Sequence, residues 1–176
     1  MIDLLETSAP PMTVPPRMAL LFNGLALAAI TAATLLPLIA VVYWLFVGTK
    51  DAADMARLPL GSLQDITMGQ GLVASLVALL VSLPMAWGLV RLRACLVSLA
   101  AGRPFTPVGI AGLRDFALGG MLAALAKLLG HTAMALVLTW NAAPGQRQLV
   151  LRIDSDMLLL AMFAGTVAAL AWAMEQ

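Results

Sequence analysis

Four long runs of apolar residues constrain the fold of this chain more than any other feature. The runs cover residues 18–47, 71–90, 116–140 and 157–174. Each is long enough to cross the ~30 Å hydrocarbon core of a bilayer as a helix. Lipid cannot hydrogen-bond a backbone, and the runs lack the polar and apolar alternation of membrane β-strands, so helices are the suitable form. The sequence therefore predicts an all-α membrane protein with four transmembrane helices in a bundle.

Composition supports one membrane domain. Only 11% of the 176 residues are charged, whereas a soluble domain has about a quarter. We expect an N-terminal cytoplasmic tail over 1–17 and a single four-helix domain over 18–176. The first run is too long for a cleaved signal peptide, which favours an uncleaved anchor. The net charge of +1 gives no reason to expect direct binding of nucleic acid.

Basic residues predict the orientation. With four spans, both termini and the loop between the second and third spans share one side of the membrane. Four arginines near span ends lie on that side: Arg91, Arg93, Arg103 and Arg114. The basic residues of the other side are accompanied by aspartates. Because positive loops stay in the cytoplasm, we expect both termini to be cytoplasmic.

The stretch "AAGRPFTPVGIAGLRDF", residues 100–116, connects the second and third spans. The helix of the second span is expected to continue to Gly102, and Pro104 prevents it from going further. Thr106 is a suitable N-cap, and Pro107 suits the first helical position. The sequence predicts a short cytoplasmic helical joint that leads into the third span.

This joint carries one group of candidate interaction residues, which are Arg91, Arg93, Arg103, Phe105 and Arg114. They are expected to meet either anionic lipid headgroups or a soluble regulator. Lipid is the simpler partner, since each basic residue near an anionic surface contributes about 1 kcal/mol. A turn with no further role is the structural alternative.

The same joint shows a family resemblance over residues 70–176. A G-x-x-F-[ST] pattern, an L-R pair and a D-x-x-L-L pattern fall on Gly102, Phe105, Thr106, Leu113, Arg114, Asp156, Leu159 and Leu160. In these features the chain resembles the bacterial four-helix membrane proteins filed as domain of unknown function 2975. The resemblance implies the bacterial inner membrane and a role beside small helix-turn-helix regulators, with no reaction. Members typically carry a charged tail after the last span, so a shortened tail is expected after Glu175.

Lys127 and His131 form a candidate polar site inside the third span. They are four residues apart and therefore project from nearly the same helix face. A lysine at the membrane centre costs about 2.5–3.5 kcal/mol, and no acidic residue lies within a span. Hydroxyls such as Ser82 are the polar candidates nearby. The alternatives are that Lys127 snorkels towards the cytoplasmic surface and that His131 is a packing residue or part of a site shared in a dimer.

Small residues recur every four positions in two further spans. Gly24, Ala28 and Ala32 form one such ladder, and Gly165, Ala169 and Ala173 form the other. Ladders of this kind let helices approach closely. They predict helix packing within the chain, or an interface in a homo-oligomer.

No pattern in the sequence predicts catalysis or a bound cofactor. The chain has no G-x-S-x-G, H-E-x-x-H or phosphate-loop pattern, and these carry the common hydrolytic and nucleotide sites. Four aspartates outside the spans, Asp51, Asp54, Asp154 and Asp156, could hold a hard cation, or the last two could cap the fourth span. We expect a non-enzymatic sensor or regulatory partner of a soluble transcription regulator; the alternative is a subunit of a small transporter or channel.

Overall fold

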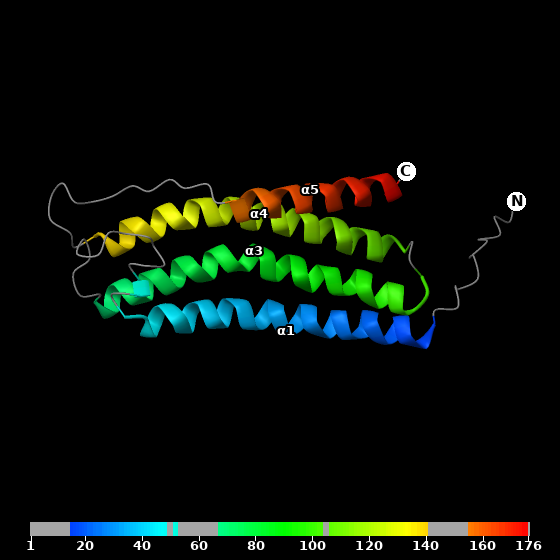
Figure 1. Cartoon of the computed structure of the whole chain (residues 1–176), viewed down its shortest axis with the longest axis horizontal. Helices are drawn as coiled ribbons and strands as arrows, with labels where there is room; N and C mark the ends of the chain where they lie inside the picture. The colour runs from blue at the N-terminus through cyan, green and yellow to red at the C-terminus, as the bar shows by residue number, and fades with distance from the viewer. Residues whose placement is uncertain (1–14, 49–50, 53–66, 104–105, 141–154, 176) are drawn as a thin grey trace, which may run out of the picture.

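Four long helices make up most of the described chain. The computed structural model describes residues 15–48, 51–52, 67–103, 106–140 and 155–175. The helices are α1 (Pro16–Phe46), α3 (Met68–Ala100), α4 (Pro107–Leu138) and α5 (Ser155–Glu175). All four are long and apolar enough to cross a membrane. The predicted all-α fold of four membrane helices packed together is confirmed (Figure 1).

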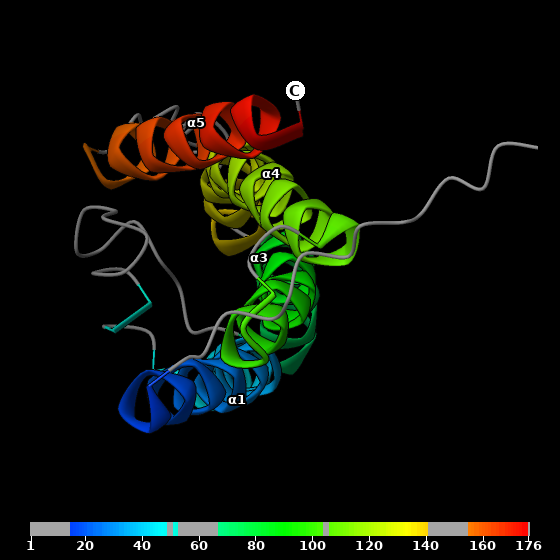
Figure 2. The same cartoon turned by 90° about the vertical axis from the view of Figure 1, so that its right-hand side faces the viewer.

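The helices lie side by side in chain order. Extensive contacts link α1 with α3, α3 with α4, and α4 with α5. Seen end-on, the row is curved, so that α1 and α5 stand at its two edges (Figure 2). The central pair, α3 and α4, therefore holds the bundle together, and one side of the row is concave.

The turn between α3 and α4 follows the local sequence signals. Gly102 has a φ of 71°, a left-handed conformation that favours glycine. The N–H of Arg103 donates to the Ser98 carbonyl at 3.0 Å and closes the helix end. The Thr106 hydroxyl accepts from the N–H of Gly109 at 3.1 Å. The predicted helix stop and N-cap are thus both present, and the predicted helical joint consists of the last turns of α3 and the first turns of α4.

Glycines bring the backbones of α3 and α4 into close approach. A Cβ added to Gly112 would lie 2.6 Å from the carbonyl oxygen of Arg91. A Cβ added to Gly119 would lie 2.8 Å from both the Cα of Gly88 and the carbonyl oxygen of Pro84. Real Cβ atoms do not come this close to a backbone, so only glycine permits the contact.

The two predicted ladders of small residues are not where the helices pack. A Cβ on Gly24 of α1 or on Gly165 of α5 would meet no atom within 4 Å. Instead α1 buries Ala29 and Ala33, and α5 buries Ala164. Within the described residues, the ladders are therefore available to a second copy, and a homo-oligomer interface there stays a prediction.

Candidate functional site

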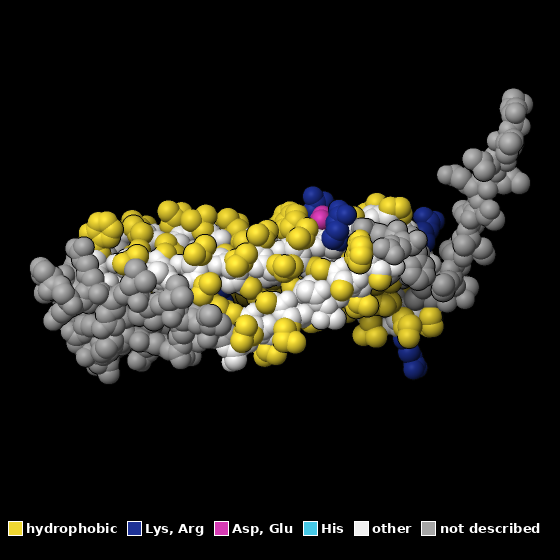
Figure 3. Space-filling view, turned by 90° about the horizontal axis from the view of Figure 1, so that it is seen from above, with side chains coloured by type: hydrophobic (Ala, Val, Ile, Leu, Met, Phe, Trp, Pro, Cys, Tyr) yellow, Lys and Arg dark blue, Asp and Glu magenta, His cyan; other side chains and the backbone are white. Residues whose placement is uncertain are grey.

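Basic side chains gather at one end of the bundle. Arg91, Arg93, Arg103 and Arg114 are all exposed where α3 meets α4; we name this the arginine end. On the face seen in Figure 3, the visible Lys and Arg side chains lie mainly towards this end, and hydrophobic side chains cover much of the rest. In Figure 1, α1 begins and α5 finishes at the same end. Phe105, predicted to join this group, lies outside the described residues.

Arg91 has two contacts that the sequence analysis missed. Its Nε lies 3.5 Å from Oδ2 of Asp115, and its Cζ lies 5.8 Å from the centre of the Trp87 ring. The spacing of Trp87 and Arg91, one helical turn apart, is a signal that could have predicted the second contact. Asp115 lies on the other helix, so no local pattern identified it. Arg91 is 56% exposed, so the ion pair orients its side chain and adds at most about 1 kcal/mol.

We expect the hydrocarbon core to lie between two groups of aromatic and polar residues. Trp87 and Arg91 suit one interface, because Trp and Arg concentrate at the headgroup level. At the other end, Gln70 donates through Nε2 to the Val137 carbonyl at 3.3 Å, and Trp140 is 71% exposed. Gln70 precedes Arg91 by 21 residues, which is about 31 Å of helix. This length matches a hydrocarbon core of ~30 Å.

The packing of α4 on α3 sets the depth of Lys127. Gly119 contacts Gly88, and further along the pair Gly130 contacts Val81. Lys127 lies between these two contacts on α4 and nearer to the second, so it is level with the part of α3 around Val81. Val81 is close to the midpoint between Gln70 and Arg91. The register therefore places Lys127 near the middle of the hydrocarbon core.

This depth favours a true intramembrane lysine over the snorkelling interpretation. Lys127 follows Arg114 by 13 residues, about 20 Å of helix. It precedes the end of α4 at Leu138 by 11 residues, about 16 Å. The four-carbon stem of lysine is shorter than either distance, so with these expected boundaries we infer that its ammonium lies below the headgroups.

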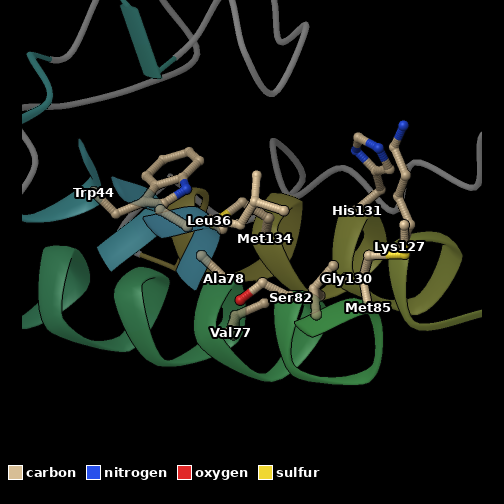
Figure 4. A pocket seen from close by; sticks show the side chains of 12 residues that line it. Leu36, Trp44, Val77, Ala78, Ser82, Met85, Lys127, Gly130, His131 and Met134 are labelled. Carbon is tan, nitrogen blue, oxygen red and sulfur yellow. The ribbon is translucent and has the colours of Figure 1, made fainter. Parts of the chain in front are cut away.

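Lys127 and His131 lie together beside a cavity of ≈ 360 Å³. Their side chains project from α4 in the same direction, and Gly130 lies lower down, near Ser82 (Figure 4). The spacing of Lys127 and His131 predicts that they lie on one helix face, and Ser82 is one of the hydroxyls expected near them. The cavity is shared by three helices, with Leu36, Ala40 and Trp44 from α1, Val77, Ala78, Val81, Ser82 and Met85 from α3, and Lys127, Gly130, His131 and Met134 from α4.

The lining is apolar except for a few groups, and none of the lining residues is acidic. The Ser82 hydroxyl already donates to the Leu79 carbonyl at 2.9 Å, and Nε2 of His131 is buried. Asp115 pairs with Arg91. In the part of the chain that the structure describes, Lys127 forms no hydrogen bond or ion pair. An ammonium group at this depth calls for a counter-charge or water.

Trp44 and Met85 are lining residues that the sequence analysis missed. Each belongs to an apolar run in which most residues look alike, so no spacing distinguished the side chains that face α4.

The candidate cation site falls partly outside the described residues, because Asp54 and Asp154 are not among them. Within the described residues, no cluster of three metal-ligating side chains occurs.

Comparison with known proteins gave no relative. No family model matches the chain, and neither a curated protein nor a solved structure matches it. The functional conclusion therefore rests on the geometry of the arginine end and the cavity, and on the sequence pattern.

Proposed function

We propose that this chain is a non-enzymatic integral protein of the bacterial cytoplasmic membrane that acts as a small sensor or regulatory partner of a soluble helix-turn-helix regulator. The observation that carries the proposal is the shape of the arginine end. α3 has 33 residues, about 50 Å of helix, which exceeds the ~30 Å core by several turns. Most of the excess lies beyond Arg91, where the last turns of α3 and the first turns of α4 extend past the expected core edge beside the start of α1 (Figure 1).

The α3–α4 turn at the arginine end has the features of a protein contact surface. Gly109 packs closely on Ser98, which holds the two helices together beyond the membrane. Arg93 and Arg103 are exposed there, and Val108 at the tip is 66% exposed. Arginine beside exposed apolar side chains is typical of protein interfaces, whereas a surface that binds lipid headgroups needs only the charges.

The resemblance to domain of unknown function 2975 supports the same role. Two of its pattern residues, Gly102 and Thr106, form the α3–α4 turn. Arg114, from the L-R pair, is exposed beside it. The positive-inside rule supports placing this end, and with it both termini, in the cytoplasm.

Site-specific photocrosslinking tests the partner. A benzophenone residue in place of Val108 should capture a small helix-turn-helix protein from cells. One in place of Leu129, which is 69% exposed and lies in the hydrocarbon core, should capture lipid. Replacing Arg93 and Arg103 with Glu should reduce capture at Val108 at least tenfold, because the charge of the surface is reversed.

Two results would contradict this proposal. Capture of lipid alone at both positions would leave the arginine end as a lipid-binding surface. A cysteine at Arg103, in a chain with Cys95→Ser, should react with an impermeant maleimide only in inside-out vesicles. Reaction in intact spheroplasts would reverse the proposed orientation.

The open row of helices favours the regulatory role over a transporter or channel subunit. Within the described residues, α1 and α5 lie at the edges of the row and enclose no central path. Lys127 and His131 line a cavity at the side of the row. A polar path would require further copies of the chain.

We also propose a homo-oligomer that uses the exposed ladder of α1. With Cys95→Ser, a cysteine at Gly24 should form a disulfide-linked dimer in membranes under mild oxidation. The matched control is a cysteine at Leu25, which is 54% exposed but turned about 100° around the helix. Several-fold more dimer is expected at Gly24, and equal yields would indicate random collision.

A further inference from the structure

The cavity beside Lys127 is bordered by three helices. Helices α1 and α4 form two of its walls and α3 forms the third. Both α1 and α4 pack extensively on α3, and residues of all three helices line the cavity. The lining runs from Lys127, near the expected middle of the hydrocarbon core, to Trp44, whose carbonyl lies beside Gly71 near the core edge.

The chemistry of the lining selects an anionic amphiphile. Lys127 supplies a cation, and the other walls supply apolar surface from residues such as Leu36, Met85 and Met134. No Asp or Glu lines the cavity, so its charge is uncompensated among the described residues. A volume of ≈ 360 Å³ lies within the range of small-molecule sites. Charge complementarity therefore calls for a ligand with one negative group and an apolar body.

The depth of Lys127 also limits which anionic amphiphiles can reach it. A phospholipid phosphate stays at the headgroup level, about 15 Å from the middle of the hydrocarbon core. A single-chain carboxylic acid is uncharged when protonated, so its head can enter the hydrocarbon core. The proton it carries in ends on the Lys127 nitrogen, which leaves a carboxylate beside an ammonium. The ligand that fits both charge and depth is a long-chain fatty acid.

We propose that the cavity binds a free fatty acid, with its carboxylate against the Lys127 ammonium beside His131 and its chain along the apolar walls that α1, α3 and α4 provide. The ligand supplies the counter-charge that the described lining lacks. A lysine in the hydrocarbon core is favoured only when paired or hydrated, so an occupied cavity stabilises this arrangement of α1, α3 and α4. The site would give the regulatory protein a lipid-derived signal, although binding does not depend on any soluble partner.

Fluorescence quenching tests the site directly, because Trp44 lines the cavity. The full chain, with Trp87, Trp140 and Trp172 changed to Phe, is placed in phosphatidylcholine nanodiscs. The probes are dibromostearic acid and its methyl ester, which share the quenching chain and differ in the carboxylate. The acid should reach half-maximal quenching of Trp44 at a concentration in the disc at least tenfold lower than the ester.

Variants at Lys127 supply the decisive comparison. Lys127→Met should abolish the tenfold preference for the acid while leaving weak quenching by the ester. Lys127→Arg should retain most of the preference for the acid. Equal quenching by acid and ester in the unchanged chain would overturn the proposal, as would a preference that persists in Lys127→Met. Circular dichroism of each variant checks that the helices are intact.

Brominated phosphatidylglycerol tests whether the cavity binds an anionic phospholipid instead of a free fatty acid. If it quenches Trp44 as strongly as the acid, and Lys127→Met removes that quenching, the cavity binds phospholipid headgroups and the fatty-acid proposal is wrong. The nanodiscs contain no soluble protein, so the result is independent of whether the arginine end has a regulatory partner.

Discussion

Replacing Gly119 with valine is expected to separate α3 from α4 and to lower the free energy of unfolding by about 3 kcal/mol. The added Cβ would lie 2.8 Å from the Cα of Gly88 and from the carbonyl oxygen of Pro84. Both obstacles are backbone atoms, so no side chain can rotate away, and the helices must move apart. Denaturant titration in lipid bicelles measures the change.

Gly165→Val is the matched control for this substitution. It makes the same chemical change in a helix, but a Cβ at Gly165 would meet no atom within 4 Å. Its effect should be within about 0.5 kcal/mol, as for other surface substitutions. A loss of stability as large as that of Gly119→Val would mean that the close approach of α3 and α4 is not what holds the bundle together.

Replacing Lys127 with leucine is expected to make membrane insertion of α4 more favourable by about 3–4 kcal/mol. A central lysine costs about 2.5–3.5 kcal/mol, and a central leucine contributes about 0.3–0.6 kcal/mol in the opposite sense. The change corresponds to at least a hundredfold shift between inserted and translocated forms. A glycosylation-based insertion assay on the segment Pro107–Leu138 measures this ratio.

Arg114→Leu in the same segment provides the comparison. Arg114 lies at the arginine end, where a basic residue meets headgroups and costs little, so its replacement should change insertion by much less. If Lys127→Leu had an effect as small as Arg114→Leu, the ammonium of Lys127 would be reaching the surface. Lys127 would then snorkel to the surface instead of lying in the middle of the membrane. Its depth would no longer favour a fatty acid over a phospholipid as the ligand.

Local signals predicted the helices and their ends well. The apolar runs placed all four spans, and Gly102 and Thr106 correctly marked the end of α3 and the start of α4. The uncharged run predicts a second span that ends at residue 90, but the helix continues to Ala100, as the sequence of the joint predicts. Caps and glycine turns depend on hydrogen bonds within a few residues, so the sequence determines them without knowledge of the fold.

The candidate site was predicted only in part, because its residues come from different helices. Lys127 and His131 were found from their spacing on a single helix. Trp44 and Met85, which complete the cavity, carried no such signal. The same holds for Asp115, whose partner Arg91 is on α3.

The sequence alone predicted four helices that are long and apolar enough to cross a membrane, the turn that ends α3 and caps α4, and which helix carries a lysine. The tertiary structure alone decided which faces meet, and hence that Gly119 packs while Gly24 and Gly165 do not. The physical reason is that lipid is as apolar as a leucine side chain, so no contrast between polar and apolar faces shows which side of a span is buried. That choice depends on how the small residues of one helix fit the backbone of the next, and the same fit sets the depth of Lys127.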